Sequence, residues 1–561
     1  MTGALAPPRP SPVEEPRTPG RWALALQAPG FIVLALGIAL GALEGGSGAE
    51  DWYPAALFVG ALYTLVALLA PPTRVERSRP WNVALILFGA FTLWSYASIL
   101  WADAPATAWD GANRTLMYWL AVATVGLRPW PAPAARAALA VAGFGGAALA
   151  VGVLAVSAWG DEPARLFLGG RLSEPTGYAN ATANLFLVAL FPLVHLALER
   201  RWGWPLRAAA YAAACAVLQT AVLTQSRGGA IALAAVTILF VALHPRRFPA
   251  IAAFAGLYGL CAIAWSTLVE VREAATANEI GPSLADARGM IAACALAATV
   301  LAALAINLLR PLFAARPVGH GVTRRAELAL AGAAVVAVVV AVGAALSTGW
   351  LDDRWHDFKT QGYEDVERGE TRFGGALGSG RYDYYRVAWS EFADHPVAGI
   401  GADNFAIPYL RERRTGEAPA YPHSLGFRVL AQLGVIGTLL FVGFVGAVCW
   451  AFAGVRRRST RAHAGVVVGA FCGGAVWLVH GLADWLWEFP ALSLVALALL
   501  AIAARAGTLP AQAPSPTGGW RARAGTRLAL GAGAVGEGAC AGSVPARAAM
   551  ASSASATSDS A

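Results

Sequence analysis

Long apolar segments alternate with short polar segments along most of the chain. The apolar segments are about 20 residues long, and an α-helix of that length crosses the roughly 30 Å hydrocarbon core of a bilayer. They are continuous rather than alternating apolar and polar, which excludes a transmembrane β-barrel. We therefore expect an all-α fold, a polytopic transmembrane helical bundle of about 12–14 spans. Fourteen candidate spans lie at residues 22–43, 53–70, 81–101, 112–127, 136–158, 178–198, 206–223, 228–243, 249–269, 289–309, 327–347, 425–453, 464–483 and 489–505.

The same pattern divides the chain into five regions. Residues 1–20 are rich in proline and 506–561 in Ala, Gly, Ser and Pro, so we expect both to be disordered. Residues 21–347 form the first part of the bundle with about 11 spans, and 425–505 the second part with about three. Residues 348–424 form one long polar loop between them. The first apolar segment is long and lacks the cleavage site of a signal peptide, so we expect it to remain as an anchor.

Composition and charge narrow the class further. With 57% hydrophobic and only 14% charged residues, the chain does not have the composition of a soluble domain. The net charge of +8 comes almost entirely from arginines in short segments between spans. We therefore expect this charge to orient the chain in a lipid bilayer, and we expect no nucleic acid partner. The cysteines have no CxxC or Cys/His spacing, so neither a metal site nor a disulfide is expected.

Arginines are unevenly distributed between the two sets of loops. Eighteen follow even-numbered spans: Arg74, Arg77, Arg79, Arg128, Arg136, Arg200, Arg201, Arg207, Arg246, Arg247, Arg310, Arg316, Arg324, Arg325, Arg456, Arg457, Arg458 and Arg461. Only six lie in short loops after odd-numbered spans: Arg114, Arg165, Arg171, Arg227, Arg272 and Arg288. Because arginine-rich loops stay in the cytoplasm, we expect both termini to be cytoplasmic and the loop 348–424 to be extracytoplasmic.

The second half of the long loop has its own pattern. Residues 381–394 show helical spacing, and we expect this helix to lie in the headgroup region. Its predicted apolar stripe consists of Tyr382, Tyr385, Ala388, Trp389 and Phe392. His395-Pro396 ends the helix, and a tight turn follows at Gly399, Gly401 and Asn404. The sequence RERR at 411–414 adds an exposed basic cluster.

His423 lies where the long loop re-enters the membrane. Arg171, Arg227, Asp484 and Glu488 are expected on the same outer face, the two carboxylates between interfacial tryptophans. A histidine at a helix end and an arginine that snorkels to the interface are ordinary alternatives. However, an arginine close to hydrocarbon costs about 2.5–3.5 kcal/mol and usually has a partner or a role. Guanidinium groups bind phosphate bidentately, and imidazole is a base near neutral pH. The combination predicts chemistry on an anionic substrate at the outer surface.

Several motifs in and around this loop resemble a known family. They are Gly380-Arg381 with an aromatic residue at Tyr385, HP ten residues later, GIGADNF at 399–405, PHS at 422–424 and QLGVIG at 432–437. TQSRGG at 224–229 and GRLSEPTGYANATAN at 170–184 are similar to further signatures of the same family. Together they resemble the O-antigen ligase and Wzy-type O-antigen polymerase family. That family typically has His-Asn where this chain has His423-Ser424, and tryptophan at Tyr385.

The resemblance implies a GT-C-like fold and a metal-independent, inverting glycosyltransferase without a cofactor. Such an enzyme transfers a glycan from an undecaprenyl-diphosphate donor to a hydroxyl of a glycolipid, glycan or protein acceptor, on the outer face of the bacterial cytoplasmic membrane. Carried over by motif, His423 is the catalytic residue, and Arg227 and Arg381 bind the donor diphosphate. The supporting candidates are Arg171, Tyr385, Arg386, Asn404, Asp484 and Glu488.

Other functions fit parts of the pattern. A polysaccharide polymerase or a protein O-oligosaccharyltransferase would use the same residues. A metal-dependent enzyme would need outer carboxylates such as Glu50, Asp51 or Asp103, but no paired-acid motif occurs there. A transporter of a lipid-linked or anionic solute is the non-enzyme alternative. Transporters usually place polar residues at the midplane and contain internal repeats, and this sequence shows neither feature.

Overall fold

The computed structural model of the chain describes residues 26–69, 78–277, 279–309, 355–356, 358–359 and 380–507. The expected span 327–347, the proline-rich residues 1–20, most of the loop before Gly380 and the tail after Gly507 lie outside the described residues.

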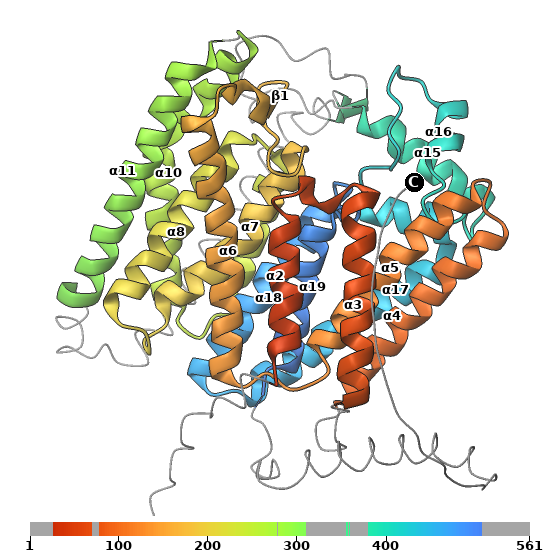
Figure 1. Cartoon of the computed structure of the whole chain (residues 1–561), viewed down its shortest axis with the longest axis horizontal. Helices are drawn as coiled ribbons and strands as arrows, with labels where there is room; N and C mark the ends of the chain where they lie inside the picture. The colour runs from red at the N-terminus through yellow and green to blue at the C-terminus, as the bar shows by residue number, and fades with distance from the viewer. Residues whose placement is uncertain are drawn as a thin grey trace, which may run out of the picture. The chain divides into compact units, whose positions relative to one another are not determined.

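The described residues are almost entirely helical (Figure 1). The N-terminal helices are α2 (Ala28–Leu40), α3 (Ala49–Leu69), α4 (Arg79–Ala97), α5 (Pro105–Val125), α6 (Ala132–Trp159), α7 (Ala179–Leu198), α8 (Trp204–Leu223), α9 (Arg227–Leu243), α10 (Arg247–Thr276) and α11 (Ile280–Leu304). The C-terminal helices are α15 (Arg381–Asp394), α16 (Ala406–Glu412), α17 (Leu425–Arg458), α18 (Arg461–Gly481) and α19 (Pro490–Arg505). Short 3-10 turns include η3 (Ser98–Leu100) and η7 (Leu486–Glu488). One small hairpin pairs β1 (Phe167–Leu168) antiparallel with β2 (Arg171–Leu172).

Nine helices in the described part of the chain are long and apolar enough to cross a membrane. Three shorter apolar helices, α2, α9 and α19, pack among them. The predicted all-α polytopic bundle is therefore confirmed. The expected span 112–127 is shifted, because α5 already begins at Pro105 with a polar first half, and it is not among the nine. Arg114, assigned above to a loop, consequently lies inside a helix.

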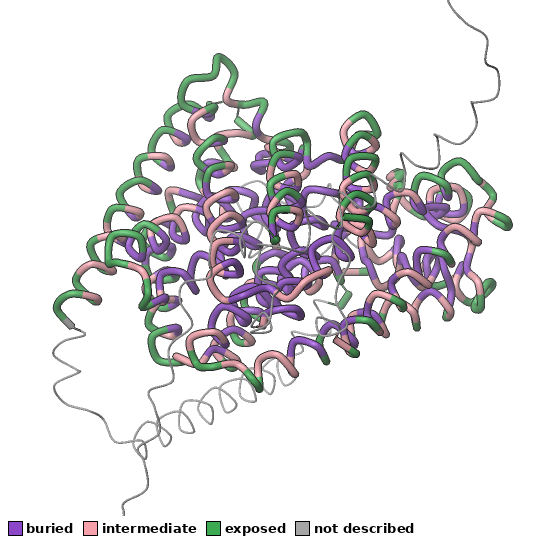
Figure 2. Tube along the Cα trace, turned by 60° about the horizontal axis from the view of Figure 1, so that its bottom comes forward, coloured by how far each residue is buried: buried purple, intermediate pink, exposed green. Residues whose placement is uncertain are grey.

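The centre of the bundle is formed by α7, α18 and α19. Nearly every residue of α7 and every residue of α19 is buried, as expected for helices that are apolar on all sides. Figure 2 shows buried residues concentrated in the middle of the bundle. Glycines allow close contact: a Cβ at Gly146 would lie 2.4 Å from Ala189, and one at Gly474 would lie 2.5 Å from Leu500. Small residues at helix contacts are typical of membrane bundles, where lipid provides no hydrophobic driving force.

Helix α17 is interrupted where the loop after α15 crosses it. Gly434 has φ +63° and ψ −164°, outside the helical range. The freed backbone groups bind the loop: Val435 N donates to Pro396 O (2.8 Å), and Gly401 N donates to Gln432 O (2.9 Å). A Cβ at Gly399 would lie 2.3 Å from the backbone of Gln432. This crossing explains why glycines are needed in both GIGADNF and QLGVIG, and it attaches the loop firmly to the end of the bundle.

Candidate active site

His423 is held between the loop and the first turn of α17. Its φ is +51°, in the left-handed region, and its carbonyl accepts a hydrogen bond from Tyr385 Oη at 3.2 Å. Ser424 caps α17 by accepting from Phe427 N, and its hydroxyl donates to Leu482 O at 2.7 Å. The His423 side chain is 15% exposed, and its Nδ1 lies 3.7 Å from Asp484 Oδ1. Aromatic rings surround the imidazole, those of Tyr178, Tyr384 and Trp485.

Asp484 is the centre of this group of residues, and it is fully buried. Its Oδ1 accepts from Tyr178 Oη at 2.9 Å and from the backbone N–H of Trp485 at 3.0 Å. Its Oδ2 accepts from Asn180 Nδ2 at 2.5 Å and from Arg381 Nη2 at 3.0 Å. The sequence did not indicate that this carboxylate is buried. Helices α7, α15 and α18 close over the group, and a buried charge requires this full set of partners.

Arg381 begins α15 and connects it to the turn after α18. Besides its ion pair with Asp484, its Nη1 donates to Ala483 O at 2.8 Å. The side chain is 15% exposed, so the guanidinium lies at the boundary of the buried network. The residue before it, Gly380, has φ +69° and allows the chain to turn into the helix.

The electrostatics keep His423 neutral and Asp484 charged. Burial lowers the pKa of His423 to about 4; Asp484 opposes this shift, and Arg381 adds to it. Burial alone would raise the pKa of Asp484, but Arg381, His423 and the N–H of Trp485 hold it below its usual value. At neutral pH the imidazole is therefore an unprotonated base beside a carboxylate, with a pKa well below the ordinary value near 6.5 that sequence alone supplies.

Arg227 is the first residue of α9, at the same end of the bundle. Ser226 caps this helix, since its Oγ accepts from Gly229 N at 3.1 Å. The same hydroxyl lies 3.4 Å from Nε2 of His480, which is in the last turn of α18, four residues before Asp484. A Cβ at Gly228 would approach that imidazole to 2.9 Å. The SRGG sequence thus combines a helix cap, an arginine, Gly228 next to His480 of α18 and Gly229 next to Ala183 of α7.

Arg171 connects the Arg227 region to Asp484. Its Nε donates to Thr224 O at 2.8 Å, and its Nη2 donates to Asn180 Oδ1 at 2.6 Å. Asn180 in turn donates to Asp484. Three residues singled out from sequence, Arg171, Arg381 and His423, therefore meet around one carboxylate that was also singled out.

The other candidates from the sequence, Tyr385, Arg386 and Asn404, do not contact Asp484 in the hydrogen bonds described above. Tyr385 stacks on Phe427 with ring centroids 4.7 Å apart and supports the backbone of His423. Arg386 binds Asp383 and the carbonyl of Glu412, which connects α15 to α16. Asn404 exchanges hydrogen bonds with the backbone of Ala104 and holds the loop against α5. Arg386 and Asn404 thus support the framework.

The predicted stripe on α15 is displaced from the buried face. The helix and its end at His395 were predicted correctly, but the buried residues are Asp383, Tyr384, Val387, Ala388 and Glu391. Trp389, expected in the stripe, is 56% exposed. The reason is that Asp383 turns inward to accept from Tyr409 Oη and from Arg414 N.

A second buried ionic group was not found from sequence. Asp403 accepts from Arg428 Nη2 at 2.5 Å and is also paired with Arg114. Arg428 Nε lies 2.7 Å from Glu488 Oε1. Glu488 is buried, and burial raises the pKa of its carboxyl.

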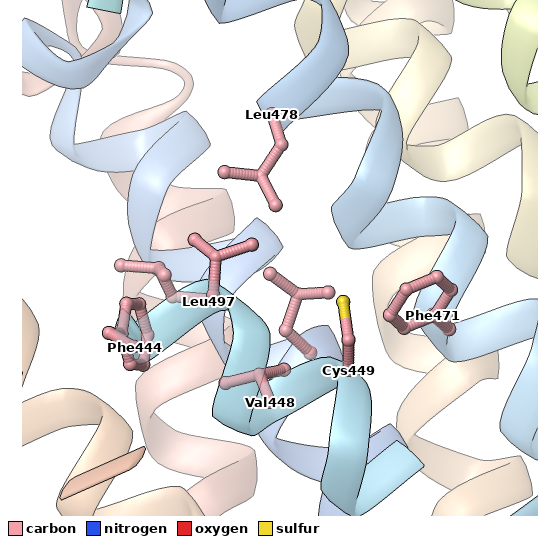
Figure 3. Close-up of a pocket in the computed structure, with 8 residues that line it drawn as sticks. Phe444, Val448, Cys449, Phe471, Leu478 and Leu497 are labelled. Carbon is pink, nitrogen blue, oxygen red and sulfur yellow. The ribbon is translucent and has the colours of Figure 1, made fainter. Parts of the chain in front are cut away.

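Two further features of the described residues concern metal ligation and an apolar pocket. Within the described ranges no group of three or more His, Cys, Asp or Glu side chains is arranged to hold a metal ion. Asp103, named above for that role, is paired with Arg411 at 3.7 Å. A small pocket between α17, α18 and α19 is lined by apolar side chains and Cys449 (Figure 3). Its lining residues include no charged side chain.

Part of the chain matches a model of a known protein family. No curated protein matches the chain. Residues 280–442 match the family model Wzy_C, described as O-Antigen ligase. The match covers less than a third of the chain but contains Arg381, Asp403, His423 and Arg428. Over these residues, the chain is similar to the O-antigen ligase family.

Proposed function

We propose that this protein is an integral-membrane glycosyltransferase that moves a glycan from undecaprenyl diphosphate to an acceptor hydroxyl at the outer face of the bacterial cytoplasmic membrane. The observation that supports it most directly is a neutral His423 with Nδ1 toward Asp484, inside the segment that matches the O-antigen ligase family. In this proposal the fold is GT-C-like, both termini are cytoplasmic, and the acceptor is a glycolipid, glycan or protein.

The reaction begins with the acceptor hydroxyl. Asp484 favours the imidazole tautomer that carries its proton on Nδ1, which leaves the Nε2 lone pair available. Nε2 removes the hydroxyl proton as the oxygen attacks the anomeric carbon. The bond from that carbon to the diphosphate oxygen breaks, and its electron pair leaves with undecaprenyl diphosphate. Attack from the opposite face inverts the anomeric centre. The negative charge of Asp484 stabilises the imidazolium formed in this step.

The arginines act on the leaving group. Arg381 lies at the boundary of the buried network and Arg227 at the N-terminus of α9. Fixed guanidinium charge and the N-terminal end of a helix both stabilise an anionic diphosphate. Arg171 holds the segment before Arg227 relative to Asp484.

The test uses the full chain in lipid nanodiscs with a labelled undecaprenyl-diphosphate-linked glycan and a solubilised envelope fraction as acceptor. Wild type should transfer label and release undecaprenyl diphosphate in equal amounts, and EDTA should not change the rate. His423→Ala should bind undecaprenyl diphosphate normally and transfer at least about 10²-fold more slowly. His395→Ala, an exposed histidine at the end of α15, is the matched control and should behave as wild type.

Transfer by His423→Ala at the wild-type rate would show that His423 is not the catalytic base. Donor movement across a sealed membrane without bond cleavage would instead identify a transporter.

A further inference from the structure

The mechanism above does not use the second buried ionic group, which consists of Arg114, Asp403, Arg428 and Glu488. The four residues are only 5%, 3%, 3% and 2% exposed. They come from α5, the loop after α15, α17 and η7. Their formal charges sum to zero.

Such a group is not explained by stability. Removing charges from water is expensive, and buried ion pairs are often no more stable than apolar residues of the same volume. Ionisable residues in the helical bundle of a membrane protein are therefore expected to have a function. Gly111 leaves room for the Asp403 carboxylate, because a Cβ at this position would lie 2.7 Å from Asp403 Oδ2.

The group joins the same two segments that carry the proposed active site. Arg428 follows His423 by five residues on α17, and Glu488 follows Asp484 by four residues through η7. The Arg428–Glu488 ion pair, at 2.7 Å, therefore joins the same two segments as the pair of His423 and Asp484, which are 3.7 Å apart. The hydrogen bond from Ser424 to Leu482 O, at 2.7 Å, is a third bridge between the same segments.

Arg428 is itself immobilised. Asp403 binds its Nη2 at 2.5 Å, and Arg114 holds the other oxygen of that carboxylate. Gln432, one turn further along α17, accepts from the backbone N–H of Asp403 at 3.0 Å through its Oε1. These contacts hold the Arg428 guanidinium in place. Its ion pair with Glu488 can therefore set the distance between the segment that carries His423 and the segment that carries Asp484.

We propose that Arg428 and Glu488 are positioning residues that hold His423 in register with Asp484, and that Asp403 and Arg114 fix Arg428 for this role. The inference rests on the proposed function of His423 as base. Neither residue of the pair touches the substrate in this scheme.

The first test is Glu488→Gln, which keeps the shape of the side chain and removes its charge. A displacement of about 1 Å at a reacting group lowers turnover by about 10²-fold, so we expect a loss of that size in kcat. Binding of undecaprenyl diphosphate and the donor KM should not change. In an Asp484→Asn background, Glu488→Gln should cause no further loss, because the interaction it positions is already absent. If Glu488→Gln does not remain monodisperse, Glu488→Asp replaces it, keeping the charge with a shorter reach.

The second test does not depend on the reaction. The ring nitrogens of ¹⁵N-labelled His423, assigned by difference from His423→Ala, should show the proton on Nδ1 in wild type. Glu488→Gln should shift them toward mixed tautomers, as Asp484→Asn does. The matched control is Arg411→Gln, which removes an exposed ion pair with Asp103 at the same end of the bundle and should change nothing.

A tautomer shift in a protein without transferase activity would support the positioning role and contradict the proposed function. Unchanged His423 signals in Glu488→Gln would overturn the positioning role. Losses that simply add in the double variant would also overturn it, because they would show a general structural effect.

Discussion

Asp484→Asn tests whether the buried carboxylate works with His423. Asparagine has nearly the same shape and still accepts hydrogen bonds from Tyr178 and the backbone of Trp485. It removes the negative charge that lies 3.7 Å from His423 Nδ1. Because its Nδ2 replaces Oδ2, it also loses the hydrogen bonds from Asn180 and Arg381. The imidazolium that forms during transfer would then have no counter-charge.

The size of the effect follows from Coulomb's law. Two unit charges 3.7 Å apart interact by about 4.5 kcal/mol at an effective dielectric constant of about 20. Since 1.36 kcal/mol corresponds to about a tenfold change in rate, kcat should fall by about 10³-fold. The donor KM should change much less, because this interaction strengthens only as the proton moves.

Stability is the competing explanation, and it has a matched control. Asp484→Asn also deprives Arg381 of its ion pair, so the variant should unfold at a lower temperature than wild type. Asp383→Asn makes the same substitution at a buried carboxylate on α15, where it breaks an ion pair with Arg386. It should be similarly destabilised yet keep kcat within about threefold, since it does not contact His423.

The assay is transfer of labelled glycan in nanodiscs, measured well below the unfolding midpoint of each variant. A folded Asp484→Asn protein with kcat within threefold of wild type would refute the pairing. Equal losses in Asp484→Asn and Asp383→Asn would refute it as well.

Four further predictions use different measurements. With the pKa of His423 lowered to about 4, kcat/KM should stay level through pH 6.5 and fall only as pH approaches 4, whereas a fall centred at 6.5 would show an unperturbed histidine. Thermal stability should decrease earlier, as pH falls from about 6.5 to about 4, because the unfolded chain takes up this proton at the higher pH. Arg227→Lys should lose most donor affinity, measured by titration with undecaprenyl diphosphate, since lysine keeps the charge but not the bidentate contact; unchanged affinity would remove Arg227 from the site. Gly416→Cys, at an exposed position of the loop, should react with an impermeant thiol reagent in intact cells, and protection from that reagent would reverse the orientation. Gly434→Ala should lower the unfolding temperature, corresponding to at least about 1–3 kcal/mol, because its Cβ would lie 2.3 Å from Val397 O; an unchanged midpoint would show that α17 can straighten there.

Much of the architecture was predictable because the bilayer imposes a local rule. Any segment that crosses hydrocarbon must satisfy its own backbone hydrogen bonds and be apolar over about 20 residues. Helices therefore occur at thirteen of the fourteen expected spans, and residues 327–347 lie outside the described residues. The helix 381–394 and the turn at Gly399 and Gly401 were predictable for the same reason, since spacing, proline and glycine act within a few residues.

The candidate site was only partly predictable. His423, Arg227 and Arg381 could be found through motifs, and Asp484 through its expected side of the membrane. The arrangement of these residues around the Asp484 carboxylate depends on contacts between residues about 300 positions apart. Examples are the hydrogen bonds from Tyr178 and Asn180 to Asp484. No local pattern encodes such a contact, because helical periodicity does not specify which neighbour a helix face meets.

Burial and charge pairing were decided by the tertiary structure alone. Sequence predicted Asp484 and Glu488 on the outer face between interfacial tryptophans, and it gave His423 its ordinary pKa. Packing against α5, α7, α15 and α17 instead removes water from all three and supplies Arg381 and Arg428 as counter-charges. The pKa of an ionisable group depends on the solvent and charges within a few ångströms. The sequence by itself therefore determined a helical membrane bundle with a histidine and arginines at one end, and only the fold decided which of these groups act together.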